Sequence, residues 1–216
     1  MSRRRVLFYV QHLLGIGHLR RAATLTRAFQ RAGLETTLVT GGHEIPGLDV
    51  GGAELVQLPP TRAADMFFKT LLDADDRPID DAWRAARRDL LLKIWRERRP
   101  HVLATELFPF GRRQMRFEVL PLLDAALGEA NRPAIVSSVR DILVAQDKPE
   151  REREMLDLTE RYFDRVLVHG DPALIPFDHT FPLMRAIQPK LRYTGYVVDE
   201  TGTIPPADGA GSGEVI

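Results

Sequence analysis

Short apolar runs alternate with longer amphipathic segments along most of the chain. The first run, Val6 to Val10, is continuous and contains β-branched and aromatic residues, which is typical of a strand buried on both faces of a parallel sheet. From about His18 the apolar residues recur at helical spacing, and Gly33 follows where a helix is expected to end. A second apolar run, Thr36 to Thr40, completes a strand–helix–strand unit, for which a right-handed crossover is expected.

The same alternation continues to about residue 194. Further strands are predicted at residues 53–58, 102–105, 134–138, 165–168 and 191–194, and further helices at about 80–99, 113–129 and 150–163. Residues 61–76 mix apolar and acidic positions without a clear period. Repeated strand–helix units predict an α/β fold with an open, doubly wound, mostly parallel sheet of about seven strands.

The long helix predicted at 80–99 carries an apolar stripe and many cations. The residues predicted to be buried are Ile79, Trp83, Ala86, Leu90 and Ile94. The cations are Arg84, Arg87, Arg88, Lys93, Arg96, Arg98 and Arg99. Acidic residues interleave with them, which favours a solvated face over the alternative, a membrane-surface patch shared with Met66, Phe67 and Phe68.

The composition changes after residue 200. Residues 201–213 are rich in glycine, proline and small polar residues, as in linkers, and Glu214-Val215-Ile216 resembles the start of a strand. We therefore predict one domain at 1–200, a linker at 201–213 and, at 214–216, the start of a second domain that is otherwise missing.

Charge and composition exclude several classes of protein. The 30 basic and 30 acidic residues cancel, so no nucleic acid partner is expected. The absence of cysteine excludes disulfides, thiolate metal sites and thiol catalysis. No apolar run reaches the roughly 18–20 residues of a membrane span, and the run behind Arg3-Arg4-Arg5 is too short for a signal peptide. We expect a cytoplasmic protein.

The strongest local motif is Gly15-Ile16-Gly17-His18, between the first strand and the first helix. Its glycines allow a tight turn that exposes amide groups at a helix N-terminus, which suits an anionic or sugar-hydroxyl ligand. Arg20 stands where a dinucleotide fingerprint requires its third glycine. His18 is a candidate proton acceptor near neutral pH. The alternative is a tight turn with an incidental histidine.

Polar and glycine residues recur at the predicted C-terminal ends of the strands, where ligands of open α/β sheets bind. They are His12, Gly15, Gly17, His18, Gly41, Gly42, His43, Glu106, Arg112, Arg113, Ser137, Ser138, Arg140, Asp141, His169, Gly170, Asp171, Gly195 and Tyr196. This distribution predicts a polar cleft, although caps and turns alone select the same residue types.

Six of these segments carry a resemblance to a known family. They are Gly15-x-Gly17-His18-x-x-Arg21, Val39-Thr40-Gly41-Gly42, Glu106-Leu107-Phe108-Pro109-Phe110-Gly111-Arg112, Ser138-Val139-Arg140-Asp141, Val168-His169-Gly170-Asp171 and Tyr193-Thr194-Gly195-Tyr196. Over about residues 4–200 the chain resembles the N-terminal, acceptor-side domain of GT-B glycosyltransferases, in particular the MurG-like and predicted-glycosyltransferase group.

The resemblance implies a metal-independent, inverting glycosyltransferase with a Rossmann-like N-terminal half and a C-terminal donor-binding domain. Such an enzyme moves a sugar from a nucleotide-sugar donor, its substrate, to a hydroxyl acceptor, which can be a small molecule, a glycan or a lipid-linked compound. It needs no cofactor. It is cytoplasmic, with peripheral contact at the inner face of the membrane as an option. The chain by itself is then expected to be inactive.

The resemblance also assigns roles to individual residues. His18 is the first candidate for the catalytic base, with Glu106 and Asp141 as rivals or as residues that orient the acceptor. Substrate binding is assigned to Gly15, Gly17, Arg21, Gly41, Gly42, Arg112, Arg140, His169 and Gly170. Arg112 and Arg140 would face an anionic acceptor group or the developing diphosphate.

Two other functions stay open. One is a nucleotide-sugar hydrolase of the same fold, in which water replaces the acceptor and release of UDP or CDP needs no acceptor. The other is a stand-alone acceptor-binding subunit of a split glycosyltransferase, which the coding sequence beyond Ile216 would distinguish from a single longer chain.

Overall fold

A computed structural model of the chain describes residues 3–66, 68–144 and 148–198. The predicted domain boundary at residue 200, the linker at 201–213 and the strand start at 214–216 lie outside these residues. Among the described helices, none combines the length and the apolar content that a membrane crossing requires.

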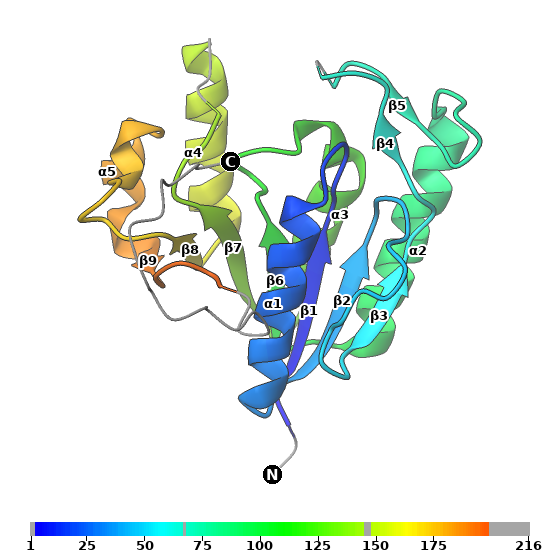
Figure 1. The fold of residues 1–216 in the computed structure, drawn as a ribbon, viewed down its shortest axis with the longest axis horizontal. Coiled ribbons are helices and arrows are strands. Elements are labelled where there is room, and N and C mark those ends of the chain that lie inside the picture. Colours follow the sequence, from blue (N-terminus) through cyan, green and yellow to red (C-terminus); the bar gives the residue numbers. More distant parts are fainter. Residues whose placement is uncertain (1–2, 67, 145–147, 199–216) are drawn as a thin grey trace, which may run out of the picture.

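A seven-stranded sheet forms the centre of the molecule, in the order β3-β2-β1-β6-β7-β8-β9, and every neighbouring pair is parallel. Its strands are β1 (Arg5–Val10), β2 (Glu35–Thr40), β3 (Glu54–Gln57), β6 (Val102–Glu106), β7 (Ala134–Arg140), β8 (Arg165–His169) and β9 (Leu191–Tyr193). The chain builds outwards from β1 in one direction and then from β6 in the other, as Figure 1 shows. The predicted doubly wound α/β sheet of about seven strands is confirmed.

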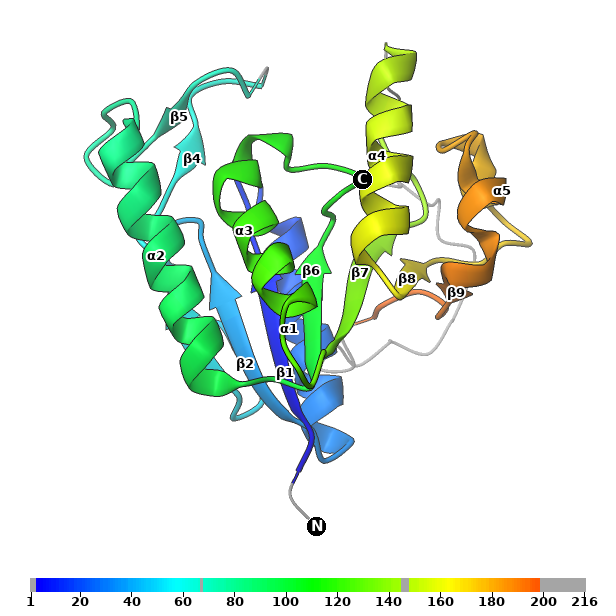
Figure 2. The same cartoon turned by 180° about the vertical axis from the view of Figure 1, so that it is seen from behind.

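Helices cover both faces of the sheet. They are α1 (Gly17–Arg31), α2 (Asp81–Arg98), α3 (Arg116–Leu127), α4 (Pro149–Tyr162) and the short α5 (Met184–Ile187), with single 3₁₀ turns at Arg113–Met115, Phe177–His179 and Gln188–Lys190. Helix α1 lies on one face, and α2, α3 and α4 lie on the other (Figures 1 and 2).

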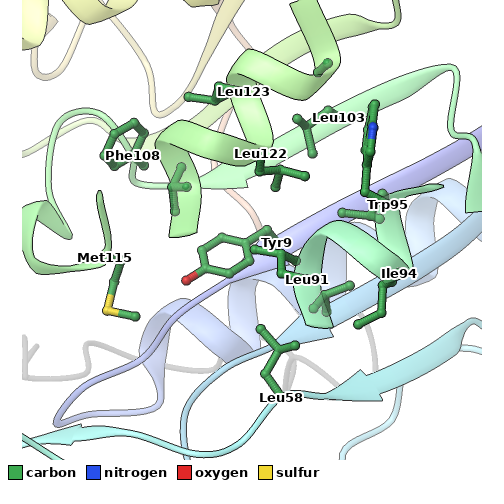
Figure 3. Packing of buried hydrophobic residues seen from close by; sticks show 14 of the residues in the cluster. Tyr9, Leu58, Leu91, Ile94, Trp95, Leu103, Phe108, Met115, Leu122 and Leu123 are labelled. Atoms are coloured by element: carbon green, nitrogen blue, oxygen red, sulfur yellow. The ribbon is translucent and has the colours of Figure 1, made fainter. Parts of the chain in front are cut away.

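Strand β1 is buried on both faces, which explains its continuous apolar run. Leu7 and Tyr9 belong to the largest apolar cluster, with residues of α2 and α3 (Figure 3). Phe8 and Val10 point to the opposite face and pack with residues of α1. Because successive side chains of a strand alternate between faces, only an apolar residue at each position buries both sides.

The buried face of α2 differs from the predicted one in two residues, Ala86 and Arg87. The structure buries Arg87, Leu91, Ile94 and Trp95, whereas Ala86 is exposed. The predicted stripe is confirmed at Ile79 and Ile94, which are buried, and at Trp83 and Leu90, which are partly buried and pack against the same core. It is wrong at Ala86, and the placement of Arg87 on a solvated face is also wrong. The reason is that Glu118 of α3, buried opposite, pairs with Arg87 and turns that side of α2 inward.

Residues 61–76, which gave no clear pattern, contain a small antiparallel sheet of β4 (Arg62–Ala63) and β5 (Leu71–Leu72). Each strand has two residues, too few for a period-2 pattern to emerge. The segment projects beyond the C-terminal edge of the large sheet, near the top of Figure 1.

Candidate functional site

A groove of about 1120 Å³ lies at the C-terminal edge of the sheet, which is the upper edge in Figure 1. The loops that follow β1, β6 and β7 line it, together with Phe68 and the first turns of α4. The strand order reverses between β1 and β6. Open α/β sheets bind their ligands at such a reversal, outside the carboxyl ends of the strands.

The lining of the groove is both apolar and basic. Its apolar side chains include Leu14, Phe68, Ile142, Leu143, Val144 and Met155, and its cations are Lys69, Arg112, Arg113, Arg116, Arg140 and Arg151. Arg113 and Arg116 both pair with Glu154. Arg112 and Arg140 form no ion pair within the described residues. The groove therefore suits a ligand with an apolar body and a negative group.

His18 lies on the first turn of α1 and lines the groove, with 23% of its side chain exposed. Its Nδ1 atom lies 2.9 Å from Oε1 of Glu106. A nitrogen of Arg21 lies 3.1 Å from the same Nδ1 atom. Because the carboxylate can only accept a hydrogen bond and its contact is the shorter one, we assign the proton to Nδ1 and the lone pair to Nε2. No residue in the described ranges bonds to Nε2, so that atom is available to accept a proton.

Glu106 ends β6 and has no exposed side-chain surface. Arg21 donates to the same oxygen, Oε1, that accepts from His18, and Ser138 donates to Oε2 across 2.7 Å. Burial alone would raise the pKa of Glu106, but the hydrogen bond from His18 and the charge of Arg21 outweigh it and hold the pKa below its usual value. The carboxylate is thus ionised at neutral pH and orients His18.

Two more polar side chains extend this network away from the groove. The Oγ atom of Ser138 lies 2.9 Å from Nε2 of His169, whose Nδ1 lies 2.7 Å from Oγ1 of Thr194. His169 is only 4% exposed, and burial lowers its pKa to about 4. The ring is therefore neutral at physiological pH.

The remaining predicted side chains lie in three different settings. Arg140 is exposed on the groove, and Arg112 lines it while its Nε donates to the backbone oxygen of Gln11 across 2.6 Å. Asp141 is buried outside the groove lining, where its Oδ1 accepts from the amide of Ile142 across 3.0 Å and stabilises its own loop. Among the three candidate catalytic residues, the structure brings His18 and Glu106 together and leaves Asp141 apart.

The predicted glycines divide into two groups. Gly15 and Gly17 line the groove, and a Cβ atom added at either would meet open space. A Cβ at Gly41 would lie 2.0 Å from the guanidinium of Arg87, one at Gly42 would lie 2.3 Å from the ring of His12, and one at Gly170 would lie 2.5 Å from Asp141. A side chain at position 41, 42 or 170 would therefore displace a neighbour, so packing gives a reason for glycine at each of them.

The sequence reasoning missed the residues that α4 contributes to the groove. The groove is lined by three residues of α4: Arg151 and, one turn further along the helix, Glu154 and Met155. Their spacing was visible in the sequence, but the direction in which the helix faces was not. Across the described ranges, no group of three or more histidine, aspartate or glutamate side chains is placed to hold a metal ion.

Comparison with known proteins identifies the fold. No protein-family model matches the sequence, and no curated protein matches it either. Among solved structures, the calicheamicin glycosyltransferase CalG4 has 16% identity and a TM-score of 0.53 over 95% of this chain and 56% of its own length. UGT2 of Phytolacca americana, complexed with UDP-2-fluoro-glucose and pterostilbene, has 12% identity and a TM-score of 0.53 over 93% of this chain and 56% of its own.

A UDP-N-acetylglucosamine 2-epimerase from Rickettsia bellii has the same fold, with 8% identity and a TM-score of 0.51 over 90% of this chain and 45% of its own. The chain thus spans about half the length of these proteins. The predicted Rossmann-like fold of the GT-B type is confirmed. At these identities the likeness concerns the fold.

Proposed function

We propose that this chain is the acceptor-side part of a glycosyltransferase that moves a sugar from a nucleotide-sugar donor to a hydroxyl acceptor. The observation that carries the proposal is the pair of His18 and Glu106, in which a buried, ionised carboxylate holds a histidine at the edge of a large groove. The GT-B type of fold supports the same function.

In the proposed reaction Nε2 of His18 accepts the proton of the acceptor hydroxyl. The acceptor oxygen attacks C1 of the sugar, the bond between C1 and the diphosphate oxygen breaks, and the nucleoside diphosphate leaves. A single displacement inverts the anomeric carbon. Glu106 keeps Nδ1 protonated and stabilises the imidazolium that forms. We propose a metal-independent step, in which helix N-termini and arginine side chains neutralise the leaving group.

The groove supports an amphipathic acceptor. Leu14, Phe68 and Ile142 would contact its apolar body, while Arg112 and Arg140 would bind a carboxylate or phosphate group. Donor binding is proposed to come from a C-terminal domain, since the chain spans 56% of CalG4. We propose a cytoplasmic site of action, with peripheral contact at the inner face of the membrane for a lipid-linked acceptor.

The test is the substitution His18→Ala in the complete enzyme. Release of nucleoside diphosphate is measured with a panel of UDP- and dTDP-sugars and phenolic and carboxylate acceptors. The variant is expected to lower turnover on the order of 10²-fold, the usual contribution of a general base, with an unchanged melting temperature. His179→Ala serves as the control, because His179 is an exposed histidine outside the groove lining. Near-normal turnover in His18→Ala would remove His18 from the mechanism.

A second candidate function is hydrolysis of the nucleotide sugar. The pair of His18 and Glu106 can activate water as well as an alcohol, and the 2-epimerase from Rickettsia bellii shows that this fold is not confined to transferases. Release of nucleoside diphosphate and free sugar at the same rate with and without acceptor would favour the hydrolase.

A further inference from the structure

A continuous line of buried polar side chains crosses the sheet behind His18. Glu106, Ser138 and His169 come from the neighbouring strands β6, β7 and β8, and are 1%, 2% and 4% exposed. Glu106 and Ser138 are direct partners in the strand register, and Thr194 follows β9 at the end of the line. Buried polar groups in an otherwise apolar sheet are retained only with hydrogen-bond partners.

The chemistry of these groups fixes the direction of every bond. The ionised Glu106 accepts the one hydroxyl proton of Ser138, so Ser138 must accept from Nε2–H of His169. A neutral imidazole then has its lone pair on Nδ1, so we assign the hydroxyl proton of Thr194 to this contact of 2.7 Å and not to the carbonyl oxygen of Gly195 at 3.2 Å. The pKa of about 4 agrees with a neutral ring, and the charged groups that act on His169 are Glu106 and Arg21, with Asp141 packed against the adjacent Gly170.

We propose that Ser138 and His169 are positioning residues that fix the carboxylate of Glu106 and, through it, the Nδ1–H tautomer of His18. The inference rests on the proposed function in one respect: the Nδ1–H tautomer is useful because it keeps Nε2 of His18 free to accept the proton of the acceptor hydroxyl. His169 is buried, so it acts through Ser138 and Glu106 and does not touch the substrate.

The position of Arg21 explains why the carboxylate of Glu106 has to be held in place. Arg21 and His18 both bond to Oε1 of Glu106, and a nitrogen of Arg21 also lies 3.1 Å from Nδ1 of His18. If the carboxylate rotated, Arg21 could donate to Nδ1 itself and impose the opposite tautomer, which has its proton on Nε2. The bond from Ser138 to Oε2 holds the other oxygen and opposes this rotation.

The tautomers can be read directly from long-range ¹H–¹⁵N correlation spectra of the ¹⁵N-histidine-labelled chain. The chain has six histidines, which single substitutions assign. In the wild type, His18 is expected as the Nδ1–H form and His169 as the Nε2–H form. His169 is expected to stay neutral from about pH 8 down to about pH 5.5, where an unperturbed histidine is already mostly protonated.

The variants Ser138→Ala and His169→Leu are expected to shift the ¹⁵N signals of His18 towards a mixture of both tautomers. Ser137→Ala is the matched control, because it removes an adjacent buried hydroxyl whose acceptor, the carbonyl of Phe108, keeps a bond from Thr105. His169→Gln places an amide NH₂ group near the position of Nε2, so it is expected to restore the wild-type signals of His18.

Two results would overturn the inference. One is an unchanged tautomer of His18 in folded Ser138→Ala and His169→Leu; the other is wild-type His169 in its Nδ1–H form. If the two variants fail to fold, the inference is tested by the tautomers of His18 and His169 in the wild type and by the His18 signals of His169→Gln. The spectra need no donor or acceptor, so a tautomer shift in the chain, combined with no transferase activity of the complete enzyme, would contradict the proposed function and leave this inference intact.

Discussion

At the scale of single residues, Arg87 shows how a cation becomes part of a core. Its guanidinium is fully buried and pairs with Glu118, and it also donates to Oε1 of Gln11 and to the carbonyl oxygens of Gly41 and Pro59. Every partner is an acceptor, and Gln11 and Gly41 directly follow β1 and β2. Arg87 thus connects the loops that follow β1 and β2 at the C-terminal edge of the sheet.

Removing this cation is expected to destabilise the protein strongly. In Arg87→Met, Glu118 stays buried with only the hydrogen bond from the Tyr9 hydroxyl and no compensating charge. Breaking such an ion pair costs about 3–5 kcal/mol. Adding Glu118→Met removes the isolated charge, so the double variant is expected to lose less free energy of unfolding than the sum of the two single losses. Urea unfolding measures both values.

Arg84→Met provides the control on the same helix. Arg84 pairs with Asp81, whose side chain is 99% exposed, and exposed pairs of this kind contribute at most about 1 kcal/mol. Equal losses in Arg84→Met and Arg87→Met would contradict the account of Arg87.

At the scale of elements, the loops that follow the parallel strands divide between packing and function. The loop after β2 packs tightly, because Gly41 and Gly42 fit against Arg87 and His12. The loop after β1 leaves space beside Gly15 and Gly17 and exposes His18 to the groove. The two glycine pairs therefore have different roles: Gly41 and Gly42 allow close packing, whereas Gly15 and Gly17 leave the groove open beside His18.

This difference predicts opposite responses to an added methyl group. Gly41→Ala is expected to destabilise the protein by about 1–3 kcal/mol or more, because its Cβ has no room beside Arg87 and Gln11. Gly17→Ala is expected to change stability by less than about 0.5 kcal/mol, as in other open sites. Thermal unfolding compares the two variants; similar melting temperatures would show that the space around Gly41 adapts.

At the scale of the whole molecule, the proposed function gives this chain one of the two walls of the binding site. The groove lies at the C-terminal edge of the sheet, and the structurally similar proteins are about twice as long as this chain. In the proposed function, acceptor and base are present on this wall, and the donor needs a second one. Neither half by itself brings C1 of the sugar next to His18.

The 216-residue chain alone is therefore expected to turn over no nucleotide sugar, whereas the complete enzyme does. Release of nucleoside diphosphate from UDP- and dTDP-sugars is measured for both under the same conditions. Sugar transfer by the isolated chain would show that this wall is sufficient and would contradict the proposed division of the site.

Much of this architecture could be predicted from the order of residues. The apolar runs at 6–10, 36–40 and 102–105 became neighbouring central strands, and His18 and Glu106 reached the same edge because parallel strands end together. The contacts behind Glu106 could not be predicted, since they join residues 25 to 32 positions apart. The burial of Arg87 on α2 was also missed, because hydrophobicity alone assigns an arginine to the surface.

The sequence by itself determined the alternation of strands and helices, the parallel sheet, and the edge to which its polar residues belong. Periodicity and chain direction are local properties, so they can be read without knowing any neighbour. Only the tertiary structure decided that Glu106 bonds to His18, that His169 is buried behind Ser138, and that Arg87 is an interior cation. Those outcomes depend on which donors and acceptors packing brings within bonding distance, since a buried polar group is stable only beside its partner.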